Sequence, residues 1–212
     1  LLVSAVVLCF GFSGEKKAYE VYDGKGAISS YADLLKSAKE SDVILFGEYH
    51  DNPICHWLEL ELTKDLYAEK KNKLVLGAEM FEADDQVIMN EYLRGVISEK
   101  TFKDEAKLWG NYETDYKPLV EFAKTNKLKF VADNIPRRYA NMVYNRGLAS
   151  LDSIDNEAKN WIAPLPIKYD STVQAYKEIF ENSGGHGGQK LPKSPAVKNA
   201  TMSYFIIKNL EK

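Results

Sequence analysis

Three short apolar runs stand out along the chain. They cover residues 42–47, 74–78 and 129–132, and each is rich in Val, Leu, Ile or Phe. A continuous apolar run of this length is typical of a strand that is buried on both faces. The sequence therefore predicts three buried strands.

Between and after these runs, apolar residues recur at helical spacing. Pro53 is suited to the first turn of a helix, Asp51 or Asn52 precedes it as a candidate N-cap, and the apolar positions continue to Leu66. Similar patterns predict helices over 84–93, 99–107, 116–126, 137–146 and 195–209. Asp84 and Asp85 are expected to cap the first of these helices and Asp115 the third, and Gly147 is expected to end the fourth.

Apolar strands separated by helices favour an α/β fold, in which helices flank a mainly parallel β-sheet on both faces. The pattern over residues 150–212 predicts a helical C-terminal part, with a glycine-rich loop over Ser183–Gln189. No strand pattern follows the last helix, so we expect this chain to be a fragment that lacks a final strand. Its length fits a single α/β domain over residues 15–212.

The chain begins with an apolar run, Leu1–Phe10. The run is shorter than the roughly 20 residues that a membrane-spanning helix needs. It matches the apolar core of a secretory signal, and the alternative is a buried N-terminal strand. We expect 1–14 to be the remnant of a signal or lipoprotein leader, and the protein to lie in the cell envelope (periplasm or outer membrane). Cys9 is a weak match to a lipid-attachment site, because Leu8 stands where Gly or Ala is usual.

The composition excludes several classes of protein. A formal net charge of -3, without a basic tract, argues against nucleic acid as a partner. Two cysteines are too few for a disulfide framework or a thiolate zinc cluster. A hydrophobic fraction of 45% is ample for a packed core.

Ionisable residues follow all three predicted strands. The segments are Glu48–Asn52, Glu79–Glu82 and Asp133–Arg138. Ligands of open parallel sheets bind beyond the carboxyl ends of the strands, so these side chains predict a cleft at one edge of the sheet. The alternative is that they only cap helices. Glu48 and Glu79 each follow a buried strand and need a partner, which Arg137 and Arg138 could supply.

Three histidines offer further chemistry. Glu48 and His50 lie two residues apart and can act as base and orienting group, or as two metal ligands. His56 is more typical of a surface or half-buried histidine. His186 lies among glycines, either in a loop that covers a ligand or in an incidental surface loop. Aromatic residues such as Tyr112 are usually core residues, although a flat apolar ligand would also suit them.

The order of several motifs resembles the ChaN-like family of bacterial haem-binding lipoproteins. Gly47–Pro53 is similar to its GExHDN opening block, Gly77–Phe81 followed by Gln86 to its second block, and Val131–Arg137 to its fourth. Further similar blocks are Trp109–Tyr112 with Asp115–Ala123, His186–Gly188 and Ala200–Tyr204. Asp133 departs from the pattern, because a second Ala is common there. The family's chains also continue beyond the last helix.

The resemblance implies that haem is the cofactor and that the protein forms a homodimer holding two cofacial haems. It also implies a role in haem and iron acquisition, transport or storage, with an outer-membrane haem receptor as a partner. A lipid anchor would be its only membrane attachment. Tyrosine suits ferric haem because a phenolate favours oxidised iron. We expect Tyr49 to bind the iron, with Tyr112, Tyr116 and Tyr139 as rivals, and His186 to reach the partner chain. The other expected haem contacts are His50 and Arg137, and the expected pocket residues are Glu48, Asp51, Asn52, Glu79, Gln86, Asn134 and Arg138.

Distant relatives of the family, which include erythromycin-esterase-like enzymes, share a Gly-Glu-x-His motif. They imply a rival hypothesis: a metal-dependent hydrolase that uses Glu48, His50 and Glu79. A third hypothesis is an envelope interaction module with a vestigial cleft. We expect a protein that is not an enzyme.

Overall fold

The computed structural model describes residues 17–182 and 191–210, which fall into two compact units that divide after Ser41. In the first unit, β1 (Val21–Tyr22) pairs with β2 (Ile28–Ser29) as an antiparallel hairpin. Helix α1 (Tyr31–Lys39) follows, capped by Ser30. The expected leader lies outside the described residues, and a single domain over 15–212 stays a prediction.

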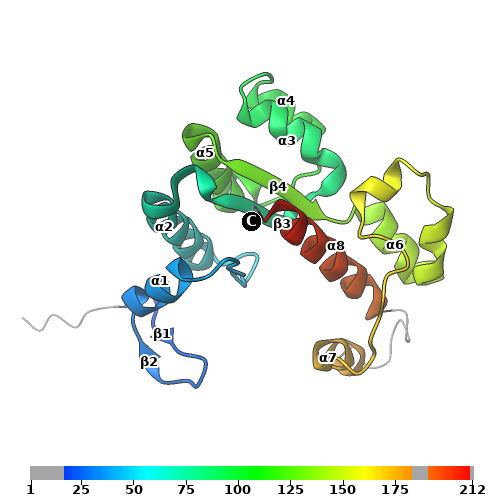
Figure 1. Cartoon of the computed structure of the whole chain (residues 1–212), viewed down its shortest axis with the longest axis horizontal. Coiled ribbons are helices and arrows are strands. Elements are labelled where there is room, and N and C mark those ends of the chain that lie inside the picture. The colour runs from blue at the N-terminus through cyan, green and yellow to red at the C-terminus, as the bar shows by residue number, and fades with distance from the viewer. Residues whose placement is uncertain (1–16, 183–190, 211–212) are drawn as a thin grey trace, which may run out of the picture. The chain divides into compact units, whose positions relative to one another are not determined.

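The second unit is built around two parallel strands, β3 (Val75–Glu82) and β4 (Lys129–Asn134) (Figure 1). Val75 pairs with Lys129 and Ala78 with Ala132, and an irregularity follows before Glu82 pairs with Asn134. The α/β fold with a parallel sheet is confirmed. Both strands continue beyond their apolar runs, so Glu79 and Asp133 lie inside strands and not after them.

The strand predicted over 42–47 is wrong. This segment has no regular secondary structure, and Val43, Ile44 and Leu45 are exposed. A strand is stable only when a neighbouring strand pairs with its backbone groups. Among the described residues, β3 and β4 pair with each other and no strand pairs with this segment. The apolar run therefore marks side chains that would be buried in contact with another surface. It does not determine that a neighbouring strand pairs with this segment.

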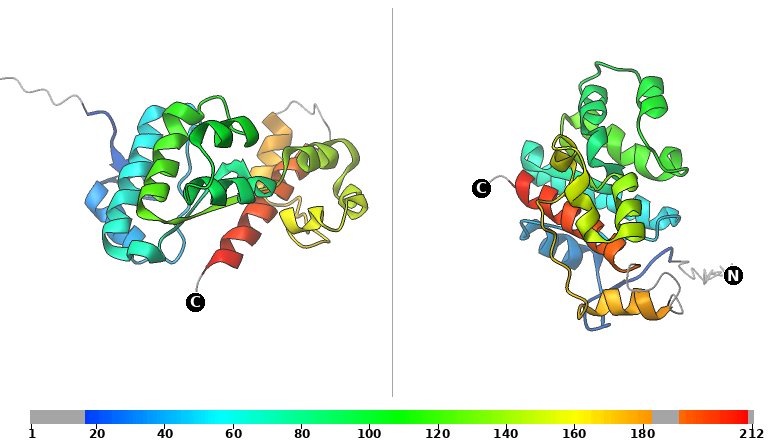
Figure 2. Two further views of the ribbon diagram at one scale, coloured as in Figure 1. Left: turned by 90° about the horizontal axis from the view of Figure 1, so that it is seen from above. Right: turned by 90° about the vertical axis from the view of Figure 1, so that its right-hand side faces the viewer.

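Helices cover the two faces of the β3–β4 pair (Figures 1 and 2). On one face, Leu76, Met80, Phe130 and Ala132 join a core cluster with α3 (Gln86–Leu93) and α5 (Lys117–Asn126). Alternate residues point to the other face. There Lys198 of α8 (Lys193–Asn209) forms an ion pair with Glu79.

The remaining helical elements of this unit are α2 (Pro53–Lys70), η1 (Lys71–Lys73), η2 (Ala83–Asp85), α4 (Glu99–Glu105), η3 (Tyr112–Tyr116, a π-helix), α6 (Arg137–Arg146), η4 (Leu148–Ser153), η5 (Ala158–Trp161) and α7 (Gln174–Asn182). Helix α6 has the predicted bounds, and Gly147 follows it with a φ of 83°. Asp85 is the N-cap residue of α3, as predicted, but its side chain makes no cap hydrogen bond, and the cap predicted at Asp115 is wrong. The Asp85 side chain binds Lys107 instead, and Asp115 lies inside the π-helix.

The C-terminal part is helical, as predicted. A second core cluster, which includes Ile135, Val143, Leu151 and Val197, joins the end of β4 to α6, η4 and α8. The predicted loop Ser183–Gln189, with His186, lies outside the described residues. Within 17–182 and 191–210, no helix combines the length and apolar character needed to cross a membrane.

Candidate functional site

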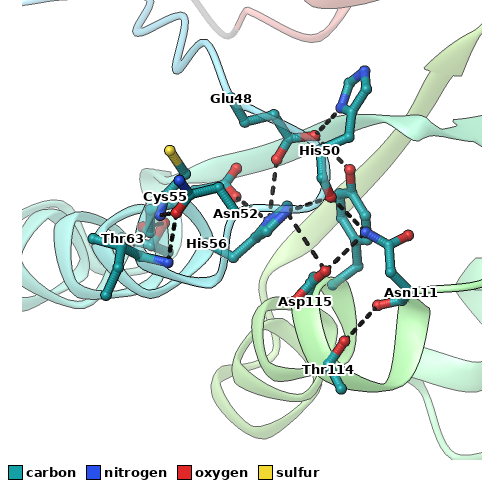
Figure 3. A network of polar contacts seen from close by, with 12 residues as sticks. Glu48, His50, Asn52, Cys55, His56, Thr63, Asn111, Thr114 and Asp115 are labelled. Carbon is teal, nitrogen blue, oxygen red and sulfur yellow. Dashed lines mark hydrogen bonds and ion pairs between the residues drawn. The ribbon is translucent and has the colours of Figure 1, made fainter.

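A network of polar contacts surrounds Glu48 (Figure 3). Glu48 stands in the segment before α2, and its Oε1 accepts a hydrogen bond from His50 Nδ1 at 2.9 Å. The same oxygen accepts a hydrogen bond from the Tyr116 hydroxyl. Its Oε2 lies 3.1 Å from Nδ1 of His56 on α2. Residues far apart in the sequence therefore meet at one carboxylate.

The cap of α2 helps to place His56. Asn52 Oδ1 accepts hydrogen bonds from the backbone N–H groups of Ile54 and Cys55, at 2.9 and 3.2 Å. This cap satisfies N–H groups that the first turn leaves without a helical partner. His56 follows one turn later, where the helix turns its side chain inward and leaves 3% of it exposed.

Backbone and amide groups then fix the orientation of the His56 ring. His56 Nε2 lies 3.0 Å from the His50 carbonyl oxygen, which can only accept, so Nε2 carries the hydrogen. Asn111 donates to the same carbonyl oxygen at 2.6 Å and to Asp115 at 2.8 Å. The π-helix that carries Asp115 thus holds the segment before α2 in place (Figure 3).

Aromatic rings close two sides of the network. The Tyr116 ring meets the His56 ring edge to face, with centroids 4.8 Å apart, and Trp109 meets His50 in the same way at 4.9 Å. Burial, followed by the bond to Glu48, raises the pKa of Tyr116 above its usual value. Tyr116 is therefore a neutral hydrogen-bond donor at ordinary pH.

Glu59 adds a second carboxylate to this side of α2. Its Oε2 lies 3.8 Å from His56 Nδ1. Burial, with a smaller contribution from Glu48, raises the pKa of Glu59 to about 7. Among the described residues, no Lys or Arg forms an ion pair with Glu48, Glu59 or Asp115. The network is therefore a partly buried acidic cluster, and within these residues the side chains that can pair with its carboxylates as cations are histidines.

Two expected haem contacts are exposed: His50, which belongs to this network, and its neighbour Tyr49. Tyr49 is 76% exposed, and the His50 side chain is 52% exposed. Asp51 is also exposed and lies in the turn before α2. By contrast, Tyr112 is buried in the first core cluster, and its hydroxyl has no hydrogen-bond partner among the described residues.

Arg137 and Arg138, which were also expected at the site, belong to a second polar group at the ends of β3 and β4. Arg138 binds Asp84, Lys107 binds Asp84 and Asp85, and the backbone of Arg137 bonds to Glu82. Glu82, Lys107, Leu108, Arg137 and Arg138 line a cavity of 340 Å³. The arginines therefore do not pair with Glu48 or Glu79, contrary to the sequence-based expectation.

Two more expected pocket residues act on the sheet itself. Gln86 donates a hydrogen bond to the Phe130 carbonyl at 2.9 Å and accepts one from the Ala132 N–H at 2.8 Å. These two bonds satisfy backbone groups along the edge of β4. Asn134 is buried and donates to the Glu79 carbonyl at 2.9 Å, which ties β4 to β3. These contacts give Gln86 and Asn134 structural roles.

The predicted convergence of three strand ends is not observed. No contact in the described part of the chain joins Glu48 or His50 to Glu79, whose ion pair is with Lys198. The convergence required a strand over 42–47, and that segment is unpaired. The arrangement therefore does not support a hydrolase that combines Glu48, His50 and Glu79.

The model of the haem-binding uptake family ChaN, of the Tiki superfamily, matches residues 34–212. The chain belongs to the ChaN family. Its fold is similar to that of ChaN of Campylobacter jejuni, solved with cofacial haem, with a TM-score of 0.56 and 15% identity over 88% of this chain and 72% of that one. No curated protein sequence matches the chain.

Within this ChaN-family chain, sequence reasoning missed His56 and Glu59. We expected His56 to be a surface or half-buried histidine, and it is among the most buried polar residues. A signal was present, since His56, Glu59, Thr63 and Leu66 follow helical spacing and form one stripe on α2. Polar residues on a stripe that is otherwise buried indicate a site that needs partners.

Proposed function

We propose that this protein binds haem through Tyr49 and serves haem or iron acquisition in the cell envelope. The observation that carries the proposal is the exposed Tyr49 side chain, which stands directly beside a fixed polar network in a member of a haem-binding uptake family.

The surroundings of Tyr49 fit a haem. Val43, Ile44 and Leu45 precede it and are exposed, Leu45 to 79%. Exposed apolar side chains that follow one another mark a surface that a ligand or partner covers. Haem offers a flat apolar ring with an iron that a phenolate can bind. The proposed iron ligand and the exposed apolar side chains thus lie within seven residues of one another in the sequence.

The rival tyrosines fit less well. Tyr112 and Tyr116 are buried, and the Tyr116 hydroxyl is already engaged by Glu48. Iron could reach either hydroxyl only after the core opened. Tyr139 packs against the second core cluster and under Arg138. Tyr49 needs no such rearrangement.

The remaining parts of the proposal rest on the sequence and on the relative. ChaN of Campylobacter jejuni binds haem cofacially. A cofacial pair of haems in this protein would bring the Tyr49 surfaces of two chains together in a homodimer. His50 and Arg137 would be further haem contacts, together with His186, which lies outside the described residues. The apolar run Leu1–Phe10 supports a lipoprotein leader, and an outer-membrane receptor would be the partner that receives or delivers haem.

A haem titration of Tyr49→Phe tests the proposal. We expect wild type to give the high-spin ferric spectrum of tyrosinate ligation, and Tyr49→Phe to lose that spectrum with roughly tenfold or more of the affinity. Tyr144→Phe is the matched control, because Tyr144 is also a partly exposed tyrosine but lies on α6. An unchanged spectrum and affinity in Tyr49→Phe would show that another residue binds the iron.

A further inference from the structure

The network holds a second arrangement that haem binding by Tyr49 does not use. Glu48, His56 and Glu59 each offer one ligand atom, and the three atoms lie within 4.8 Å of one another. His56 and Glu59 are three residues apart on α2, so the helix places them on one face. Glu48 reaches His56 from the segment before the helix (Figure 3).

The hydrogen bonding of His56 defines what its other nitrogen can do. Because Nε2 donates to the His50 carbonyl, Nδ1 of a neutral ring carries a lone pair. Nδ1 is buried and has no hydrogen-bond partner among the described residues. It faces Glu48 Oε2 at 3.1 Å and Glu59 Oε2 at 3.8 Å. A lone pair that faces two carboxylates is unfavourable unless a proton or a metal ion lies between them.

The groups behind these atoms are arranged as they are around metal ligands. A histidine that binds a metal usually donates its other ring N–H to a carbonyl or carboxylate, which fixes the ring. Here the His50 carbonyl accepts that bond, and Asn111 holds the carbonyl and Asp115 together. Tyr116 and His50 occupy Glu48 Oε1, which leaves Oε2 directed at His56.

The spacing is suited to a small ion. Two ligands of a tetrahedral ion at about 2.1 Å lie about 3.4 Å apart. The distance between Glu48 Oε2 and His56 Nδ1 is 3.1 Å, and the distance from His56 Nδ1 to Glu59 Oε2 is 3.8 Å. A small rotation of the Glu59 side chain would complete the set.

We infer that Glu48, His56 and Glu59 form a binding site for one divalent transition-metal ion, separate from the haem iron. The imidazole favours Zn²⁺ or another first-row ion over Mg²⁺ and Ca²⁺, which prefer oxygen ligands alone. Three protein ligands leave a fourth position for water or a small anion. The two carboxylates that face His56 Nδ1 also need a compensating positive charge, because neither forms an ion pair with a Lys or Arg of the described residues.

The experiment uses haem-free protein stripped with a chelator and titrated with ZnCl₂ by calorimetry. We expect one Zn²⁺ per chain, and at least about tenfold weaker binding in Glu59→Gln, which keeps the size of the side chain and removes its charge. Glu61→Gln is the matched control, since Glu61 lies on the same helix but is exposed and paired with Lys64. We expect this control to bind Zn²⁺ as tightly as wild type.

Two further variants separate this site from the neighbouring thiol and from the proposed haem ligand. Cys55→Ser should keep the Zn²⁺ affinity, because the free thiol on α2 is not part of the proposed set. Tyr49→Phe should also keep it, because Tyr49 supplies no ligand to this set. Circular dichroism checks that each variant is folded. Absence of stoichiometric Zn²⁺ binding by folded wild type, or unchanged affinity in folded Glu59→Gln, would overturn the inference.

Discussion

Asp133 is a buried carboxyl group in β4. Its Oδ1 has no hydrogen-bond partner among the described residues, and the nearby ion pair of Lys198 is with Glu79. Burial, with a smaller contribution from Glu79, raises the pKa of Asp133 to about 7. The folded protein therefore holds this proton more tightly than the unfolded chain does.

This raised pKa predicts how stability depends on pH. Between the usual aspartate pKa of about 3.9 and the folded value near 7, the contribution of Asp133 to stability falls as the pH rises. Asp133→Asn keeps the shape and cannot ionise. We expect it to raise the free energy of unfolding by about 2 kcal/mol at pH 8 and to have little effect at pH 4.

Urea unfolding of both proteins at the two pH values measures the difference. An equal effect at pH 4 and pH 8 would show that Asp133 is already ionised in the folded protein.

At the scale of elements, β3 and β4 need a glycine where they meet. A Cβ at Gly77 would lie 2.9 Å from Asp133 Oδ2 and 3.4 Å from the Val131 carbonyl oxygen. Gly77 sits opposite Val131 in the parallel register, so the Val131 carbonyl oxygen cannot move away without shifting β4. The buried Asp133 side chain would have to rotate to make room. The close approach of the two strands depends on the missing side chain.

Gly77→Ala should therefore destabilise the protein by about 1–3 kcal/mol, because the added methyl group crowds a packed sheet. Gly110→Ala is the control in the same unit, since a Cβ there meets no atom within 4 Å. Thermal unfolding of both variants compares them. If the two variants melt together, the contact at Gly77 is relieved at little cost.

At the scale of the whole molecule, the haem proposal has a consequence for assembly. Cofacial binding requires that two copies face each other, and a symmetric pair uses the same surface of both chains. Exposed Val43, Ile44, Leu45 and Tyr49 provide such a surface in the second unit.

We expect haem to convert the protein from monomer to dimer with two haems, measured by light scattering after size exclusion. Tyr49→Phe should remain a monomer at the same haem concentration. A haem-loaded wild type with the mass of one chain would rule out the cofacial arrangement and leave Tyr49 as a ligand within one chain.

Local patterns determined much of this protein. The apolar stripe that follows Asn52 and Pro53 predicts α2, and the helical pattern before Gly147 predicts the bounds of α6. Two apolar runs predict β3 and β4. These elements follow from capping and periodicity, which act between near neighbours in the chain. The motif Gly47–Pro53 likewise led to the ChaN family and to haem.

Only the tertiary structure decided which residues meet. Glu48 lies with His56, Glu59 and Tyr116, and not with Glu79, because the segment before α2 is not a strand of the sheet. The apolar run 42–47 could not show this, since a strand requires a partner from elsewhere in the chain. The burial of His56 also depends on packing against the π-helix, a contact between residues about sixty positions apart.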